Sequence, residues 1–110
     1  MSSSISTATT ARALAALAAL GHEARLEVYR LLVRAGQGGM LVGELAEHTD
    51  LPLSTLAHHL RTLVSADLVT QERKGREVVN RANYAAMNAA LSFLTSKCCQ
   101  GVTLVKDGTA

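Results

Sequence analysis

The sequence predicts one small, mainly helical domain that carries a single β-hairpin. Apolar residues make up 48% of its 110 residues, but aromatic residues make up only 3%. The core is therefore built from aliphatic side chains, many of which favour helices. Most of the chain has apolar residues at spacings of three and four, as amphipathic helices do. Residues 68–82 differ, because valines flank Lys74-Gly75 there, which is typical of two strands joined by a turn.

The first part of the chain predicts two helices behind a polar leader. Residues 1–10 are rich in Ser and Thr, and we expect them to be flexible. A helix over about residues 10–20 ends at Gly21, which suits a C-terminal cap. A second helix covers residues 22–35 and ends in a glycine-rich stretch. Its expected inward residues are Leu26, Tyr29, Leu32 and Val33.

The middle of the chain predicts two helices joined by a very short turn. A short strand at residues 40–42 leads to a helix over residues 43–49. The segment Asp50-Leu51-Pro52-Leu53 predicts a tight turn, with Pro52 near the start of a helix that continues to Ala66. Two helices joined this closely form a helix-turn-helix. With the hairpin as a wing, and a last helix capped by Asn83 and running to about Lys97, the layout is a winged helix-turn-helix.

The helix over residues 53–66 has an apolar face and a polar face. Short hydrogen-bonding side chains, a histidine and an arginine on the polar face can reach phosphates and base edges in a DNA major groove. The predicted DNA contacts are Ser54, Thr55, His58, Arg61 and Thr62. His59 lies on the flank and suits DNA contact or packing better than a metal. This helix alone does not separate a DNA contact from an ordinary solvated face.

Cations at the tip of the hairpin favour the DNA interpretation. Arg73, Lys74 and Arg76 lie around Gly75, where they suit phosphate contact or the minor groove. A charged turn alone is usually just solvated, and a net charge of +2 does not by itself require nucleic acid. The combination of this turn with the preceding helix predicts binding to double-stranded DNA.

Three segments resemble the ArsR/SmtB family of metalloregulatory repressors. Residues 17–26 resemble the family's A-L-G-x-x-x-R-L opening, and residues 54–63 resemble its S-T-x-S-x-H-L recognition helix. Leu68-Val69, followed by the cationic turn, resembles its strand and wing. The resemblance covers about residues 12–97. It implies a repressor that is a homodimer through its first and last helices, bound to an imperfect inverted repeat.

A helical wheel independently gives both end helices an apolar stripe. The expected dimer-interface residues are Leu14, Leu17, Met87, Leu91 and Leu94. On the wheel, Cys98 continues the stripe of the last helix.

Cys98 and Cys99 are the only cysteines of the chain, and they are adjacent. A disulfide between neighbours is strained, and two cysteines without nearby His, Asp or Glu do not complete a tetrahedral zinc site. Thiolates prefer soft centres, and trivalent arsenic or antimony needs only three ligands. Two incidental cysteines are the alternative. Their adjacency and the preceding Lys97 favour a reactive sensor pair.

The resemblance narrows the choice of sensor. The family's arsenic site in the first helix of the helix-turn-helix needs Cys-x-Cys, and its last-helix zinc site needs Asp and His; both are absent here. Some arsenic-responsive members use a C-terminal vicinal pair, which residues 95–101 resemble. The resemblance thus implies release of DNA by trivalent arsenicals or antimonite. Those members often add a third cysteine. Its absence favours organoarsenicals such as methylarsenite, which need two thiolates.

We therefore expect a flexible segment at residues 1–10, a DNA-binding and dimerisation domain at residues 11–97, and a cysteine-pair sensor with a flexible tail at residues 98–110. No cofactor is required beyond the arsenical inducer. The alternative function is a thiol redox or sulfide sensor on the same scaffold. A third hypothesis is an interaction module that does not bind DNA.

Two further classes are disfavoured by the sequence. No set of nucleophile, base and orienting group suggests an enzyme, and no apolar run is long enough to span a membrane. The adjacent, unpaired cysteines fit the reducing cytoplasm.

Overall fold

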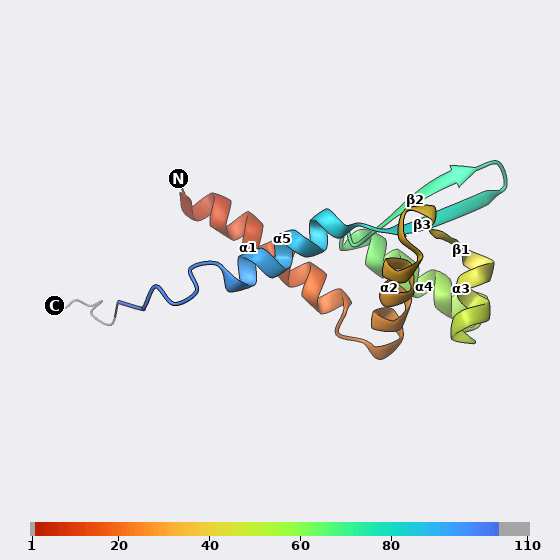
Figure 1. Ribbon diagram of the computed structural model, residues 1–110, viewed down its shortest axis with the longest axis horizontal. Helices are drawn as coiled ribbons and strands as arrows, with labels where there is room; N and C mark the ends of the chain where they lie inside the picture. The colour runs from red at the N-terminus through yellow and green to blue at the C-terminus, as the bar shows by residue number, and fades with distance from the viewer. Residues whose placement is uncertain (1, 104–110) are drawn as a thin grey trace.

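The computed structural model describes residues 2–103, with side chains from Thr7 onward, and confirms the winged helix-turn-helix (Figure 1). The elements in order are α1 (Ser2–Ala19), α2 (Glu23–Ala35), the short 3-10 helix η1 (Gly36–Gly38), β1 (Met40–Leu41), α3 (Val42–Thr49), α4 (Leu53–Ser65), β2 (Val69–Lys74), β3 (Glu77–Ala82) and α5 (Tyr84–Thr95). We call residues 23–82 the lobe and the pair of α1 and α5 the arm. In Figure 1 these two helices lie side by side and extend away from the lobe.

The first helix is longer than the sequence predicts. α1 begins at Ser2, well before the predicted start near residue 10, and Met1 lies outside the described residues. The flexibility of residues 1–10 stays a prediction. Once the alanine-rich stretch has formed a helix, each added residue completes one more backbone hydrogen bond. α5 also runs beside α1, and Thr9 shares a hollow with alanines of α5.

Leucines from three helices and the start of the wing make the core of the lobe. The side chains of Leu32, Leu45, Leu56, Leu63 and Leu68 have no exposed area. On α2 the buried stripe contains Val28 instead of the expected Leu26 and Val33, which are 42% and 40% exposed. Packing of α2 against α3, α4 and the sheet turns the helix so that Val28 faces the core.

The recognition helix α4 ends in a Schellman motif. Asp67 has φ 66° and takes the left-handed position usually held by glycine. The amide of Leu68 donates to the carbonyl of Leu63 at 2.9 Å, and the amide of Asp67 donates to that of Val64 at 2.9 Å. Leu63 and Leu68 are both buried, so the hydrophobic contact that accompanies this motif anchors the wing to α4.

The wing is a tight antiparallel hairpin, as predicted. β2 and β3 pair from Val69↔Ala82 to Lys74↔Glu77, and Gly75, with φ 62°, occupies the first loop position, where glycine is favoured. β1 adds to the other edge of β3, giving the order β1-β3-β2. Gly39 is needed before β1, because a Cβ there would lie 2.6 Å from the carbonyl oxygen of Asn80.

The arm buries alanines and exposes leucines. Ala13, Ala16 and Ala90 are buried, which lets the two helices approach closely. Leu14, Leu91 and Leu94 are 65%, 48% and 60% exposed, while the other two expected interface residues, Leu17 and Met87, are half-buried. No helix among residues 2–103 is long and apolar enough to cross a membrane.

Candidate DNA-binding face and cysteine pair

The predicted reading residues of α4 lie mostly on its open side. Ser54, Thr55, His58 and Arg61 are exposed, and Thr62 is half-buried with its hydroxyl donating to the His58 carbonyl at 3.3 Å. The opposite side of α4 is fixed by the leucines at 56, 60 and 63, which are buried. Leu53, at the start of the helix, is 61% exposed although the helical pattern of residues 53–66 predicts it on the apolar face. The docked leucines keep the reading residues turned outward.

His59 is a buried residue that the sequence pattern placed only on the flank. It is 6% exposed, and its Nδ1 has no hydrogen-bond partner. Its ring centroid lies 4.8 Å from that of His22 and 5.7 Å from that of His58. His22 is 37 positions away in the chain, so helical periodicity carries no signal for this contact.

The three wing cations are exposed and not neutralised by contact with a carboxylate. Among the described residues, one ion pair lies on the hairpin: a guanidinium nitrogen of Arg81 is 2.8 Å from Oε1 of Glu72. The hydrogen bond from Arg81, followed by the charge of Lys74, lowers the pKa of Glu72. Arg81 also donates to the Gln37 carbonyl at 2.7 Å, so it belongs to the base of the wing.

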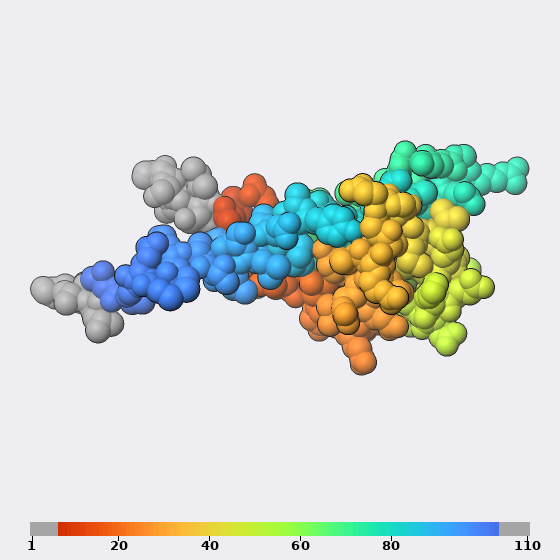
Figure 2. All heavy atoms as spheres, viewed as in Figure 1, coloured from red at the N-terminus to blue at the C-terminus, as the bar shows by residue number. Residues whose placement is uncertain are grey.

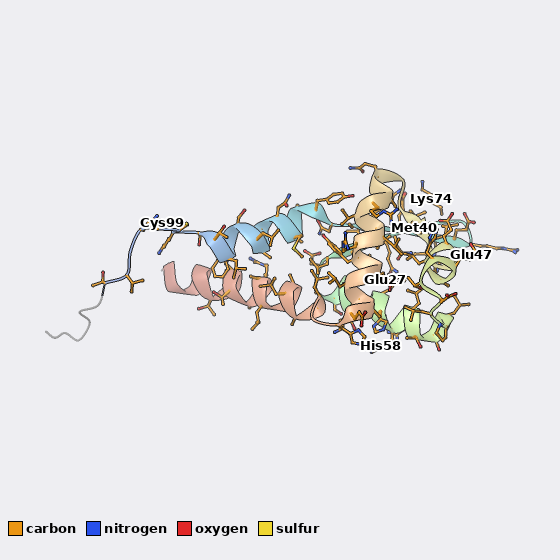
Figure 3. The ribbon with its side chains drawn as sticks, turned by 60° about the horizontal axis from the view of Figure 1, so that its bottom comes forward. Glu27, Met40, Glu47, His58, Lys74 and Cys99 are labelled. Carbon is orange, nitrogen blue, oxygen red and sulfur yellow. The ribbon has the colours of Figure 1, made fainter. Side chains whose placement is uncertain are left out.

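This arrangement leaves the remaining cations of the wing available to an outside anion. Arg73, Lys74 and Arg76 are all exposed. The wing stands out from the rest of the lobe (Figure 2), and Figure 3 shows Lys74 and His58 at opposite edges of the lobe. The two predicted DNA contacts, the polar face of α4 and the tip of the wing, are therefore separate in space.

The cysteine pair lies beyond α5 and not on it. α5 ends at Thr95, whereas the sequence predicts a helix to about Lys97 and places Cys98 on its apolar stripe; both expectations are wrong. Thr95 and Ser96 end the helix with their hydroxyls, which donate to the carbonyls of Leu91 at 3.2 Å and Phe93 at 2.8 Å. Such local bonds compete with helix continuation.

Two tight turns hold the thiols together. The amide of Cys98 donates to the Thr95 carbonyl at 3.1 Å, and that of Gln100 donates to the Lys97 carbonyl at 3.3 Å. Lys97 and Cys99 both have positive φ, 63° and 67°, which costs non-glycine residues about 1 kcal/mol each. The two Sγ atoms lie 2.8 Å apart and share a hydrogen bond, and both cysteines are exposed.

That thiol–thiol hydrogen bond, with a smaller contribution from partial loss of solvent, raises the pKa of Cys98. The result differs from the sequence argument, in which Lys97 activates a thiolate. A raised pKa reduces the fraction of Cys98 present as the reactive thiolate, so reactions that need a free thiolate are slowed.

The described residues offer no other ready ligand site for a metal. They contain no group of three or more His, Cys, Asp or Glu able to hold a metal ion. A hollow of about 400 Å³ lies between α1, the end of α4 and the start of α5, but it is lined mostly by alanines and contains no cysteine. Cys99 lies at the end of the molecule opposite His58 and Lys74 (Figure 3).

A helix-turn-helix with an open polar face on its second helix, followed by a cationic wing, defines the class of winged helix-turn-helix transcriptional regulators. Residues 20–72 match the protein family described as a helix-turn-helix domain. An ArsR-like transcriptional regulator from Rhodococcus sp. RHA1 is 30% identical, with 79% of each chain covered and a TM-score of 0.70. The chain belongs to the ArsR family of transcriptional regulators.

Other relatives extend the comparison. A possible transcriptional regulator for arsenical resistance is 27% identical in sequence to this chain. Its structure aligns over 74% of this chain and 81% of that regulator, with a TM-score of 0.65. The homodimeric winged helix-turn-helix domain Mb0332 from Mycobacterium bovis is 28% identical, with coverages of 84% and 78% and a TM-score of 0.61. The transcriptional repressor SdpR of Bacillus subtilis (strain 168) is 26% identical over 57 residues, or 52% of this chain. The match spans 63% of the length of SdpR.

Proposed function

We propose that this protein is a homodimeric, cytoplasmic repressor that releases its operator when a trivalent arsenical binds Cys98 and Cys99. The observation that carries the proposal is the thiol pair itself: two exposed sulfurs 2.8 Å apart at the end of the arm. In this proposal residues 11–97 bind DNA and dimerise, and residues 98–110 hold the sensor and its tail. Residues 104–110 lie outside the described part of the chain.

DNA is bound by α4 and the wing. Ser54, Thr55 and His58 lie in the first turns of α4, from which recognition helices usually reach base edges. Arg61 and Thr62 follow on the same helix and contact the DNA backbone. Arg73, Lys74 and Arg76 contact phosphates or the minor groove, since exposed cations at a hairpin tip gain most from a nearby polyanion.

The dimer forms through the arm. The exposed leucines at 14, 91 and 94 supply most of the apolar area, and Leu17 and Met87 add their half-buried edges. The homodimeric Mb0332 domain supports this assembly. A twofold dimer presents two copies of α4 about 34 Å apart, one turn of DNA, so the operator is an imperfect inverted repeat.

The arsenical binds by ligand exchange without a change of oxidation state. Each of two thiols replaces one hydroxide of the arsenical, forming one arsenic–sulfur bond and releasing one water. Methylarsenite, which has two hydroxides and a methyl group, is satisfied by Cys98 and Cys99 alone. Arsenite and antimonite keep a third ligand that the described residues do not supply, so we expect them to be weaker inducers. The proton of each thiol leaves with the displaced hydroxide as water.

Coupling to DNA passes through Asn83, the residue at the start of α5. Its Oδ1 accepts from the Ala86 amide at 3.3 Å and so caps α5, while its Nδ2 donates to the Asp67 carbonyl at 2.9 Å, directly after α4. Arsenical binding reshapes the turn after α5 and with it the arm of the dimer. A difference of only about 1–3 kcal/mol between the two forms weakens DNA binding 5- to 150-fold.

The test is fluorescence anisotropy of the reduced protein on the DNA upstream of its own gene. Methylarsenite, arsenite, antimonite, zinc and peroxide are titrated against wild type and the double variant Cys98→Ser/Cys99→Ser. We expect trivalent arsenicals to release wild type, methylarsenite at the lowest concentration, and to leave the double variant bound. Release of the double variant by the same arsenicals would rule out the cysteine pair as the sensor.

A thiol redox or sulfide sensor is the second candidate, favoured by the short Sγ–Sγ distance. A polysulfide bridge avoids the strain of a disulfide between neighbours. The rate of its formation depends on the thiolate and therefore increases with pH. Release by peroxide or sulfur species alone, with a bridge seen by mass spectrometry, would select this candidate.

A further inference from the structure

Three imidazole rings meet where the start of α2 packs against the recognition helix α4. His59 is the centre of the cluster: its side chain is buried, and its Nδ1 faces no hydrogen-bond donor or acceptor. His22 lies on one side, with ring centroids 4.8 Å apart, and His58 on the other, at 5.7 Å. A buried nitrogen without a partner is costly to the fold, and neither the DNA contact nor the cysteine pair explains it.

The charged and titratable groups around His59 all have the same sign when ionised. They are His22 and Arg25 at the start of α2 and His58 on α4 itself, and no carboxylate is among them. Arg25 is held in place by its Nε, which donates to the Ala19 carbonyl at 2.7 Å. A proton added to His59 would therefore meet a fixed cation and two further imidazoles, with no acceptor for its Nδ1–H.

His22 ties the cluster to the start of α2. It is the N-cap of α2, and its Nδ1 accepts from the Ala24 amide at 3.2 Å. The ring that packs beside His59 is therefore also the ring that caps α2.

The position of His59 on α4 connects the cluster to the DNA-facing side. Its neighbours Leu56 and Leu60 are buried in the core of the lobe, and the preceding residue, His58, is on the exposed face. Repulsion at a protonated His59 would therefore act directly between α4 and the start of α2.

We propose that His59 and His22 form a pH-sensitive contact between the α1–α2 corner and the recognition helix, so that acid below about pH 6.5 loosens α4 and weakens DNA binding. Only the DNA part rests on the proposed function. The loosening is a property of the fold and is independent of the arsenical.

The direction of the effect follows from linkage. Burial, and then the charges of His22, Arg25 and His58, lower the pKa of His59 below its ordinary 6.5. The unfolded chain then takes up a proton at a higher pH than the folded chain. The free energy of unfolding therefore falls as the pH drops from 6.5 towards the lowered value.

The experiment compares His59→Gln with His58→Gln, the same change at adjacent positions of which one is buried and one exposed. Thermal unfolding of the full chain is followed at about pH 7.5 and about pH 5.5, on either side of the ordinary histidine pKa. We expect wild type and His58→Gln to lose stability in acid, and His59→Gln to lose clearly less. An equal loss in His59→Gln would overturn the proposal.

Two more variants protect the test against a folding defect. His59→Leu removes the unpartnered nitrogen, and His22→Asn removes the neighbouring imidazole while keeping a strong N-cap. Both are expected to flatten the pH dependence. NMR titration of the imidazole resonances gives a direct measurement in wild type, and a His59 that titrates together with His58 would contradict the proposed contact.

DNA affinity at the same two pH values supplies the second readout. The ratio of affinity at neutral pH to affinity in acid should fall several-fold in His59→Gln relative to wild type, while His58→Gln should not lower it. Wild type that binds no DNA at neutral pH would contradict the proposed function, and the unfolding comparison would still decide the role of His59.

Discussion

The lobe buries its leucines, whereas the arm exposes them. Leu32, Leu45 and Leu63 have no exposed area in the lobe, while the buried positions of the arm are alanines and two of its leucines, Leu14 and Leu94, are at least 60% exposed. The core of the lobe is therefore complete within one chain. The arm retains apolar surface of the kind that marks an interface, so its structure depends on what covers it.

The largest expected effect comes from a leucine of the lobe. Leu63→Ala removes a fully buried side chain and should lower the free energy of unfolding by about 2–5 kcal/mol. Leu94→Ala, the matched change in the arm, should change it far less at protein concentrations where the chain is monomeric. Urea denaturation measures both. Equal losses would mean that Leu94 belongs to the core of a single chain.

Charge in the arm should separate assembly from folding. The double variant Leu91→Glu/Leu94→Glu should be monomeric in sedimentation experiments and still folded, because both side chains are exposed. Its affinity for the full operator should fall roughly 10²-fold or more, because a monomer binds one half-site whereas the dimer binds two linked half-sites. Val102→Glu, an exposed apolar residue beyond α5, is the control and should remain dimeric. A dimeric double variant would move the interface elsewhere.

Charge in the wing should change the salt dependence of DNA binding. In the variant Arg73→Glu/Lys74→Glu/Arg76→Glu, the slope of log affinity against log salt should decrease by about one for each lost phosphate contact. Stability should hardly change, because all three side chains are exposed. Arg30→Glu/Arg34→Glu on α2 is the control. An unchanged slope in the wing variant would remove the wing from the DNA contact.

The smallest effect is expected at the base of the wing. In wild type the ion pair with Arg81 lowers the pKa of Glu72, and the substitution Glu72→Gln removes this ion pair. This stabilisation is present above the ordinary carboxyl pKa and is lost as the pH falls through the lowered value. Variant and wild type should therefore differ slightly in unfolding temperature at neutral pH and converge in acid. A difference that persists in acid would have another origin.

The comparison also explains what the sequence could and could not predict. The turn at Pro52, the hairpin at Gly75 and the cap at Asn83 were predicted correctly, because each depends on residues close in the chain. The start of α1 at Ser2 and the end of α5 at Thr95 were not, because helix ends respond to neighbours such as the opposing helix and to hydroxyls that bond locally. The DNA contacts, the dimer residues and the ligand of the cysteine pair stay predictions.

His59 shows the same limit inside the site. A helical wheel places it between the two faces of α4, and nothing in the spacing indicates that His22, from another element, lies 4.8 Å away. Long-range contacts of this kind decide which of two adjacent histidines is buried and which is exposed. The signal lies in the fold and not in the local pattern.

Asn83 gives the arm a particular mechanical property. α5 has 12 residues and is therefore about 18 Å long, with Asn83 fixed at one end and the cysteine turn at the other. A rotation of only a few degrees about Asn83 displaces the thiols by one to two ångströms (~18 Å multiplied by the angle in radians). Structures with and without a bound arsenical should therefore differ most at residues 96–100 and least at the hydrogen bond between Asn83 and Asp67, through which we propose that α4 is reached.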